Sequence, residues 1–272
     1  MNNVVLFGSL LNPLSAVAAS FFHHQGILKA IVIPKKERFT IHYSIKGGIV
    51  FFLSQILIGI HRYGRVLLRI LNVNRSTKYS CLLEFISSHP SVPVAAIARY
   101  DGDIDLFFLG KNIKVGHDSI LISCIFPFKI PVKSDLIKYR INIHPGVLPE
   151  NRGPNPYFWA LAKRELFSGI TFHQLTETFD QGPIMHIATF AVDFTESEYQ
   201  LEKRAVECLD ETLPYFMDNF IELYKNPSPQ TMGRYYTEPD KADRIIHGKK
   251  SWFNGSDLIW FMARIKKDHR QR

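Results

Sequence analysis

The sequence predicts an α/β fold in which an open, mostly parallel twisted sheet is flanked by helices. Short segments rich in β-branched residues alternate with longer segments of helical periodicity, the pattern of parallel sheets joined by helices. An Asn-x-His pair ends one of these strands, where open α/β sheets bind their ligands. The chain of 272 residues is long enough for one large domain with an appendage.

Alternating strands and helices follow one another along the chain. The predicted strands are Val4–Phe7, Leu28–Ile33, Val92–Ile97, Ser119–Cys124, Arg140–His144 and Gly169–Leu175. The predicted helices are Pro13–Gln25, Lys78–Ser88, one that begins near Asn155 and a long one from Thr195 to about Tyr224. Glu196 and Glu198 support the start of the long helix, because acidic side chains favour the positive end of the helix dipole.

The strand that ends at His144 carries the first two candidate catalytic groups. Successive side chains of a strand point to opposite faces, so Ile141 and Ile143 face the core while Asn142 and His144 lie side by side on the other face. Pro145 has no amide hydrogen and ends the ladder there. The sequence therefore places an amide and an imidazole at the carboxyl end of a strand.

Two segments rich in proline and glycine follow this strand. The segment Pro145–Pro156 is too rich in both for a regular element, and it carries Arg152, a side chain suited to anions. Asp180 lies beyond the strand Gly169–Leu175, and Gly182 re-aims the chain, so the carboxylate can return to His144. The alternative is that the histidine is a hydrogen-bonded structural residue and the aspartate only part of a turn.

These residues resemble the folate-dependent formyltransferases, which include glycinamide ribonucleotide, methionyl-tRNA and amino-sugar N-formyltransferases. The family pattern is roughly Asn-x-His-x-Ser-x-Leu-Pro-x-x-Arg-Gly, followed by a strand and Asp-x-Gly. The matching residues are Asn142, His144, Leu148, Pro149, Arg152, Gly153, Asp180 and Gly182. The resemblance is strong from about Ile120 to Val192, and one departure is Gly146, where the family has Ser. It implies a Rossmann-like domain and a catalytic triad of Asn142, His144 and Asp180.

The chemistry implied by the resemblance explains these residue types. A primary amine attacks the formyl carbon of 10-formyltetrahydrofolate, and the oxyanion of the tetrahedral intermediate needs hydrogen-bond donors. Asn142 and His144 can supply them. Histidine also suits the proton transfer between the two nitrogens, and Asp180 would orient His144 and favour its charged form. Neither a covalent enzyme intermediate nor a metal is required.

The resemblance also suggests binding residues. The folate donor is expected in a pocket beside the loop after Ser119–Cys124, where Phe128 and Ile130 align with positions that present backbone groups to the pterin ring. The expected donor-binding residues are Phe126, Phe128, Ile130, Thr178 and Asp180. The expected acceptor-binding residues are Ser9, Arg152 and Asn155. The alternative is that the two phenylalanines are ordinary core residues.

Composition restricts the remaining possibilities. Three widely spaced cysteines give neither a disulfide framework nor zinc-ligand spacing. The start Met1-Asn2-Asn3 lacks the basic segment of a signal peptide, so a cytoplasmic enzyme is expected. The net charge of +8 serves solubility or an anionic ligand, such as the folate tail or a phosphorylated acceptor. Nucleic acid is not favoured, because no nucleic-acid motif accompanies the charge.

The segment 45–71 has several interpretations. Its apolar part, Gly48–Ile60, is too short to cross a bilayer. Arg62, Arg65 and Arg69 then follow at helical spacing on one face. The segment could be an amphipathic helix on an anionic membrane surface, could pack on the sheet, or could contact a second subunit in a homodimer.

The predicted organisation is a catalytic domain over residues 1–225, with a helical insertion at about 44–72, and a short extension over 226–272. The extension is too short for the β-barrel domain of methionyl-tRNA formyltransferases. The Arg152–Pro156 run favours the tRNA and amino-sugar branches, whereas His173 is purine-like. A small-molecule amine, such as a nucleotide-linked amino sugar, is the expected acceptor. The alternatives are methionyl-tRNA, glycinamide ribonucleotide, or hydrolysis of the formylfolate.

Overall fold

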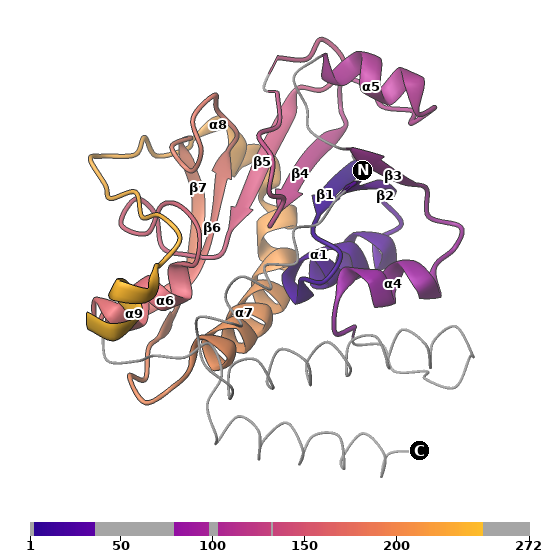
Figure 1. Ribbon diagram of the computed structural model, residues 1–272. Helices are drawn as coiled ribbons and strands as arrows, with labels where there is room; N and C mark the ends of the chain where they lie inside the picture. The colour runs from indigo at the N-terminus through magenta and orange to yellow at the C-terminus, as the bar shows by residue number, and fades with distance from the viewer. Residues whose placement is uncertain (1–2, 36–78, 98–102, 132, 247–272) are drawn as a thin grey trace.

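A seven-stranded mixed sheet forms the centre of the protein (Figure 1). The structure is a computed structural model that describes residues 3–35, 79–97, 103–131 and 133–246. The strand order is β3-β2-β1-β4-β5-β6-β7. The strands are β1 (Val4–Gly8), β2 (Leu28–Pro34), β3 (Val94–Ile97), β4 (Ile120–Cys124), β5 (Tyr139–His144), β6 (Phe167–Gln174) and β7 (Ile184–Ala191).

The first five strands of the chain pair in parallel, whereas β6 pairs antiparallel with both of its neighbours, β5 and β7. The chain winds outward from β1 on one side and from β4 on the other, so the strand order reverses between these two neighbours. In such sheets the carboxyl ends on either side of the reversal are splayed apart and form a crevice. The prediction of a mostly parallel α/β sheet is confirmed.

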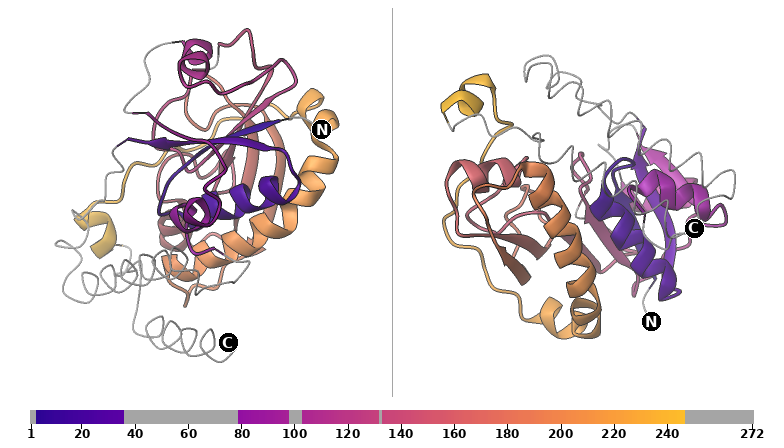
Figure 2. Two further views of the ribbon diagram at one scale, coloured as in Figure 1. Left: turned by 90° about the vertical axis from the view of Figure 1, so that its right-hand side faces the viewer. Right: turned by 90° about the horizontal axis from the view of Figure 1, so that it is seen from below.

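Helices cover both faces of the sheet (Figure 2). They are α1 (Pro13–His24), α4 (Leu82–Ser88), α5 (Ile104–Gly110), α6 (Pro156–Ala162), α7 (Glu198–Asp218), α8 (Phe220–Lys225) and α9 (Lys241–Ile246). The left view of Figure 2 shows α1, α4 and α7 against one face and α5 beyond the other. Each face buries its own apolar cluster. One includes Phe22, Phe85 and Phe216, and the other includes Phe7 and Phe108.

Several elements differ from the sequence prediction at their ends. The helix predicted from Lys78 begins at Leu82, because the carboxylate of Glu84 accepts the main-chain N–H and the hydroxyl of Ser80 and holds the preceding turn. The long helix predicted to reach Tyr224 ends at Asp218 and restarts at Phe220. The elements α5, β7 and α9 were not predicted.

Part of the prediction falls on residues that the structure does not describe. The segment 45–71, with its three interpretations, lies entirely outside the described residues. Within the described residues, no helix combines the length and the apolar character needed to cross a bilayer. The proposed boundary between residues 225 and 226 stays a prediction.

Candidate active site

The pair predicted at the end of a strand lies at the carboxyl end of β5. In the register of the parallel pair, Asn142 lies beside Ser123 of β4, and Ile141 and Ile143 are buried in the core beneath α7. Asn142 and His144 therefore point to the opposite face, as the period of two predicts. His144 is only 4% exposed, and Asn142 is half-buried.

Asp180 returns to this strand end from the turn between β6 and β7. Its Oδ1 lies 3.4 Å from Nδ1 of His144 and accepts the Asn142 Nδ2–H at 3.4 Å. Its Oδ2 accepts the main-chain N–H of Gly153 at 2.9 Å. Asp180 has φ 54°, a left-handed conformation that aspartate tolerates in tight turns. The structure thus brings together the three groups that the sequence predicted would meet.

Both ring nitrogens of His144 face oxygen acceptors. Nε2 lies 2.7 Å from the carbonyl oxygen of Asn151, so it must carry a hydrogen, because a carbonyl only accepts. Nδ1 lies 3.4 Å from the Asp180 carboxylate. A neutral ring would direct a lone pair at that carboxylate, whereas the imidazolium donates to both partners. The contact with Asn151 therefore fixes a hydrogen on Nε2, and Nδ1 faces the carboxylate in either charge state of the ring.

The Asp180 carboxyl is held in its ionised form. Burial by itself would raise its pKa, but the charge and hydrogen bond of His144 and the main-chain hydrogen bond of Gly153 outweigh that effect. The net result is a pKa well below the usual range of an aspartate. Asp180 is therefore a fixed negative charge at neutral pH, a role that suits orientation of His144 better than proton exchange.

His173 of β6 is a fourth member of the cluster, and the sequence did not assign it a role. The antiparallel register places it directly opposite Asn142, and its Nε2 lies 3.1 Å from the Asn142 Nδ2. Its Nδ1 lies 2.9 Å from the carbonyl of Gln174, so Nδ1 carries the hydrogen and Nε2 accepts from Asn142. The ring thereby fixes the orientation of the Asn142 amide. Only the pairing of two strands reveals this contact.

The loop after β5 is tied to β6 by Thr171. The buried hydroxyl of Thr171 donates to the carbonyl of Gly146 at 2.6 Å and accepts the N–H of Leu148 at 3.2 Å. Gly146, the departure from the family pattern, has no room for a side chain. A Cβ there would lie 2.8 Å from the Pro156 Cβ and 3.0 Å from Nε2 of His144. The glycine lets this loop pack directly on His144 and α6.

The residues predicted to bind the donor lie after β4. Ile125 leaves the strand at φ 58°, a strained conformation for a β-branched residue that is common at functional sites. The side chains of Phe126 and Ile130 are buried in the α5-side cluster, where Phe126 packs edge-on against Phe7. Among the described residues, the main-chain groups of Phe126, Phe128 and Ile130 have no hydrogen-bond partner. Backbone donors and acceptors over apolar walls would fit the edge of a flat heteroaromatic ring.

The other predicted binding residues are spread around the same edge of the sheet. Thr178 is exposed in the turn before Asp180. Ser9 follows β1, two strand spacings or about 10 Å from β5. Asn155 begins α6 at φ 53°, and its side chain donates to Glu238. The guanidinium of Arg152 donates to Gln230 and to the carbonyl of Thr231, so it is occupied by the C-terminal segment that covers it. Their binding roles stay predictions.

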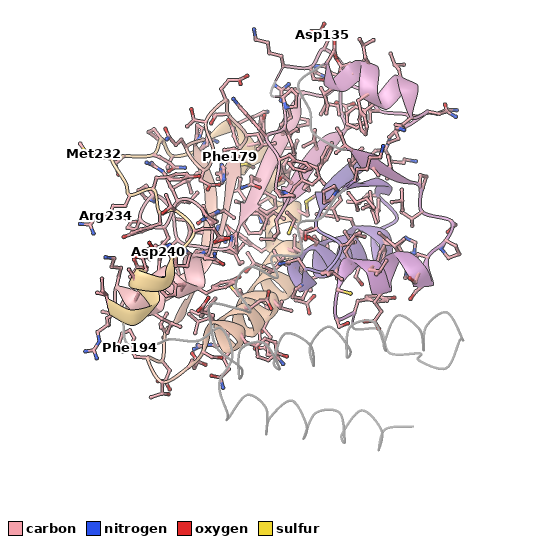
Figure 3. All side chains as sticks on the ribbon, in the orientation of Figure 1. Asp135, Phe179, Phe194, Met232, Arg234 and Asp240 are labelled. Atoms are coloured by element: carbon pink, nitrogen blue, oxygen red, sulfur yellow. The ribbon has the colours of Figure 1, made fainter. Side chains whose placement is uncertain are left out.

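Residues 228–238, which we name the C-terminal strap, cross the outside of this site. Arg152 pairs with Tyr235 through a parallel β-bridge, and Trp159 of α6 stacks on Tyr236 at 4.7 Å between ring centroids. Figure 3 labels Met232 and Arg234 on this segment, on the side of the molecule that carries α6 and α9. Burial, and then the charge of Asp180, raise the pKa of Tyr235. The strap therefore lies within electrostatic reach of Asp180.

Comparison with known proteins finds a family match over part of the chain. Residues 134–216 match the family model of the formyl transferases. The methionyl-tRNA formyltransferase of Pseudothermotoga lettingae is 32% identical over 117 residues, which cover 43% of this chain and 39% of that protein. The chain thus spans about two-fifths of the length of this relative.

Two solved structures share the fold over nearly the whole chain. WlaRD, a sugar 3N-formyl transferase studied with dTDP and 5-N-formyl-THF, has a TM-score of 0.61 at 14% identity, over 94% of this chain and 81% of that one. The N-formyltransferase of Helicobacter canadensis, in complex with folinic acid and dTDP-3-aminofucose, has a TM-score of 0.58 at 12% identity, over 94% and 82%. These likenesses establish the Rossmann-like formyltransferase fold.

Proposed function

Because residues 134–216 belong to the formyl transferase family, we propose that this chain transfers a formyl group from 10-formyltetrahydrofolate to a primary amine. The observation that carries the proposal is the convergence of Asn142, His144 and Asp180 at the carboxyl end of β5. The matched segment contains all three residues, two of them on β5 and the third in the turn between β6 and β7. An amide, an imidazolium and a fixed carboxylate form a set suited to acyl transfer.

The proposed mechanism stabilises the tetrahedral intermediate with two donors. The Nδ2 of Asn142 lies 3.1 Å from Nε2 of His173 and 3.4 Å from Oδ1 of Asp180, and it donates one hydrogen to each. The longer bond is the weaker, so the second N–H is the one available to the oxyanion. The protonated Nδ1 of His144 lies at the same carboxylate oxygen and supplies the second donor. Each such donor is worth roughly 3 kcal/mol in the barrier.

Proton movement in this mechanism centres on His144. The attacking amine loses a proton and the leaving folate nitrogen gains one. Because Asp180 stays ionised, it is a poor base, and the imidazole is the group whose ordinary pKa suits exchange near neutrality. The Nε2 bond to Asn151 keeps the ring in place, while Nδ1 gives its proton to the leaving folate nitrogen and then takes the proton that the attacking amine loses. Asp180 stabilises the ring while it is charged, before the first of these transfers and after the second.

The donor is proposed to lie with its pterin ring against the Phe126–Ile130 segment. The unpartnered backbone groups there can bind the ring edge, and the strained Ile125 sets the direction of the segment. This segment follows β4, and Asn142 lies on the neighbouring β5, so a ring bound there is adjacent to the catalytic amide. Thr178 would close the pocket from the turn before Asp180.

For the acceptor we propose an amino sugar carried on a nucleotide. Support comes from the two solved structures that share the fold over most of the chain, since both are sugar N-formyltransferases or bind an aminated sugar nucleotide. The net charge of +8 suits a phosphorylated acceptor. The three widely spaced cysteines suit a reducing cytoplasm as the compartment.

The decisive experiment is to incubate the protein with 10-formyltetrahydrofolate and a panel of amines. The panel contains dTDP-amino sugars, glycinamide ribonucleotide and methionyl-tRNA, and the readouts are formation of tetrahydrofolate and mass analysis of the acceptor. We expect a formylated amino sugar with the wild-type protein and none with His144→Ala, which should still bind the folate. Turnover only with methionyl-tRNA would refute the acceptor assignment.

An arm without any acceptor distinguishes transfer from hydrolysis. Release of formate at the same rate with and without amines would make the protein a formyltetrahydrofolate hydrolase. Absence of both reactions, with intact folding and folate binding, would contradict an enzymatic role for the cluster.

A further inference from the structure

Gln230 of the C-terminal strap contacts both the turn that carries Asp180 and the loop that follows His144. Its side-chain oxygen accepts the Arg152 Nε–H at 3.0 Å and an Nη2–H at 2.7 Å. Its side-chain nitrogen donates to the carbonyl of Asp180 at 3.0 Å and to the carbonyl of Gly182 at 2.6 Å. The oxygen of this amide thus accepts two hydrogen bonds from one loop, and its nitrogen donates both hydrogens to the other.

These contacts lie directly behind the bond that closes the catalytic cluster. The residue after Arg152 is Gly153, whose N–H donates to the Asp180 side chain at 2.9 Å. Gln230 therefore joins the same two loops that the bond between Gly153 and Asp180 joins. Gln230 binds the main-chain carbonyls of the Asp180 turn, whereas Gly153 binds the Asp180 side chain. Asp180 has a left-handed φ of 54°, which costs free energy in a residue other than glycine. Contacts from outside the turn must therefore stabilise this conformation.

The charge of the residue at this position matters as much as its shape. Arg152 is buried and would pair well with a carboxylate. A carboxylate here, however, would face the carbonyl oxygens of Asp180 and Gly182 without a hydrogen to donate. Only an amide of this length satisfies the guanidinium on one side and the two carbonyls on the other.

We propose that Gln230 is a positioning residue for the transfer reaction, which sets the distance between the Asp180 carboxylate and His144 by clamping the Asp180–Gly182 turn to the Arg152–Gly153 loop. The inference rests on the proposed function, because it assigns Gln230 a part in that same site. It identifies a third segment, distant in sequence from the motif residues, on which the geometry of the site depends. Gln230 itself does not contact His144, and it acts through Asp180.

The test compares three single variants in the full-length protein. Gln230→Met keeps the length and removes every hydrogen bond. Gln230→Glu keeps the acceptor for Arg152 and removes the donors to Asp180 and Gly182. Thr231→Ala is the matched control, because the Thr231 side chain is exposed and its carbonyl, which binds Arg152, is retained. Steady-state kinetics with the folate donor and the best amine give kcat and KM for each.

The expected result is a loss in kcat for both Gln230 variants. Displacement of a catalytic group by up to about 1 Å lowers rates by about 10- to 100-fold, and we expect kcat to fall within this range. The KM for the folate donor should change by less than about threefold. Thr231→Ala should turn over at the wild-type rate. Wild-type kcat in Gln230→Glu would overturn the proposal, because it would show that the contact with Arg152 alone suffices. That variant keeps the test valid even if Gln230→Met does not fold.

A double-mutant cycle separates positioning from a general effect on the fold. If Gln230 acts through Asp180, then Gln230→Met should add nothing further to the loss in Asp180→Asn. Independent, multiplicative losses would overturn the proposal. A second readout does not need activity: the Gly153 amide proton should move upfield and lose protection from exchange in both Gln230 variants. If the wild type formylates no amine, the proposed function fails, while the Gly153 resonance still decides the role of Gln230.

Discussion

The main-chain N–H of Gly153 lies 2.9 Å from Oδ2 of Asp180, so the loop that leaves His144 binds the carboxylate that faces His144. The cluster is therefore a closed ring of contacts. The imidazole binds Asn151 and Asp180, and the loop containing Asn151 and Gly153 returns to the same carboxylate. Each contact fixes the next, which suits a site whose groups must keep one geometry through the reaction.

The charge of Asp180 is expected to be essential for turnover. In Asp180→Asn the side chain keeps its shape but no longer presents a negative charge to Nδ1 of His144. We expect kcat to fall by about 100-fold or more, because an aspartate that orients a catalytic histidine is not replaced by its amide. Folate binding should change little. Comparable kcat values in the two proteins would contradict the role assigned to this carboxylate.

The low pKa of Asp180 also makes the stability of the protein depend on pH. Its pKa in the folded state lies below the value of about 3.9 in an unfolded chain, because the stabilising contacts of His144 and Gly153 outweigh burial. The ionised carboxylate therefore stabilises the fold above that pH. The contribution is lost progressively as the pH falls from about 4 towards the folded-state pKa.

Urea unfolding of the wild type and Asp180→Asn from about pH 3 to pH 7 measures this effect. This pH range spans the ordinary pKa of an aspartate in an unfolded chain. The difference in free energy of unfolding between the two proteins should be level from about pH 5 to 7 and should shrink below about pH 4. A difference that grows on acidification would show that Asp180 is neutral in the folded protein.

The local geometry of β5 was predictable because it depends on one strand alone. The period of two places Asn142 and His144 on one face, and proline at 145 ends the ladder. The end of the long helix was predicted less accurately, because it is set by contacts at Asn219 that periodicity does not show. Both the main-chain N–H and the side-chain Nδ2 of Asn219 donate to the carbonyl of Tyr215, at 3.1 Å and 2.8 Å, and α8 starts beyond it.

Contacts between segments distant in sequence were not predictable in this way. His173 joins the site because the register of β6 against β5 places it opposite Asn142, and no local pattern fixes that register. Gln230 lies in an irregular strap without periodicity, so nothing in the sequence around it indicates a partner. Arg152 was expected to face an anion, but its guanidinium is directed to Gln230 and Thr231. The family resemblance located Asp180, which local patterns only permitted.

Gly146 is expected to be required even though the family pattern usually has Ser there. In Gly146→Ser the new Cβ would lie 2.8 Å from the Pro156 Cβ and 3.0 Å from Nε2 of His144, so the backbone or the ring must shift. We expect a loss of about 1–3 kcal/mol in the free energy of unfolding and a clear fall in kcat. Gly116→Ser is the control, because nothing lies within 4 Å of a Cβ at that position. Equal stability of the two variants would show that the loop accommodates the side chain freely.

The hydroxyl of Thr171 is expected to stabilise the loop beside His144. Thr171→Val keeps the shape of the side chain but leaves the buried carbonyl of Gly146 and the N–H of Leu148 without their partner. A buried group left unsatisfied costs about 1–3 kcal/mol, so the free energy of unfolding should fall by at least that amount. Because the loop also carries Asn151, which binds the Nε2 of His144, kcat should fall with it. Thr171→Ser retains the hydroxyl and should recover most of the free energy of unfolding and of kcat. If the serine variant is as unstable and as slow as the valine variant, the effect comes from packing of the methyl group instead.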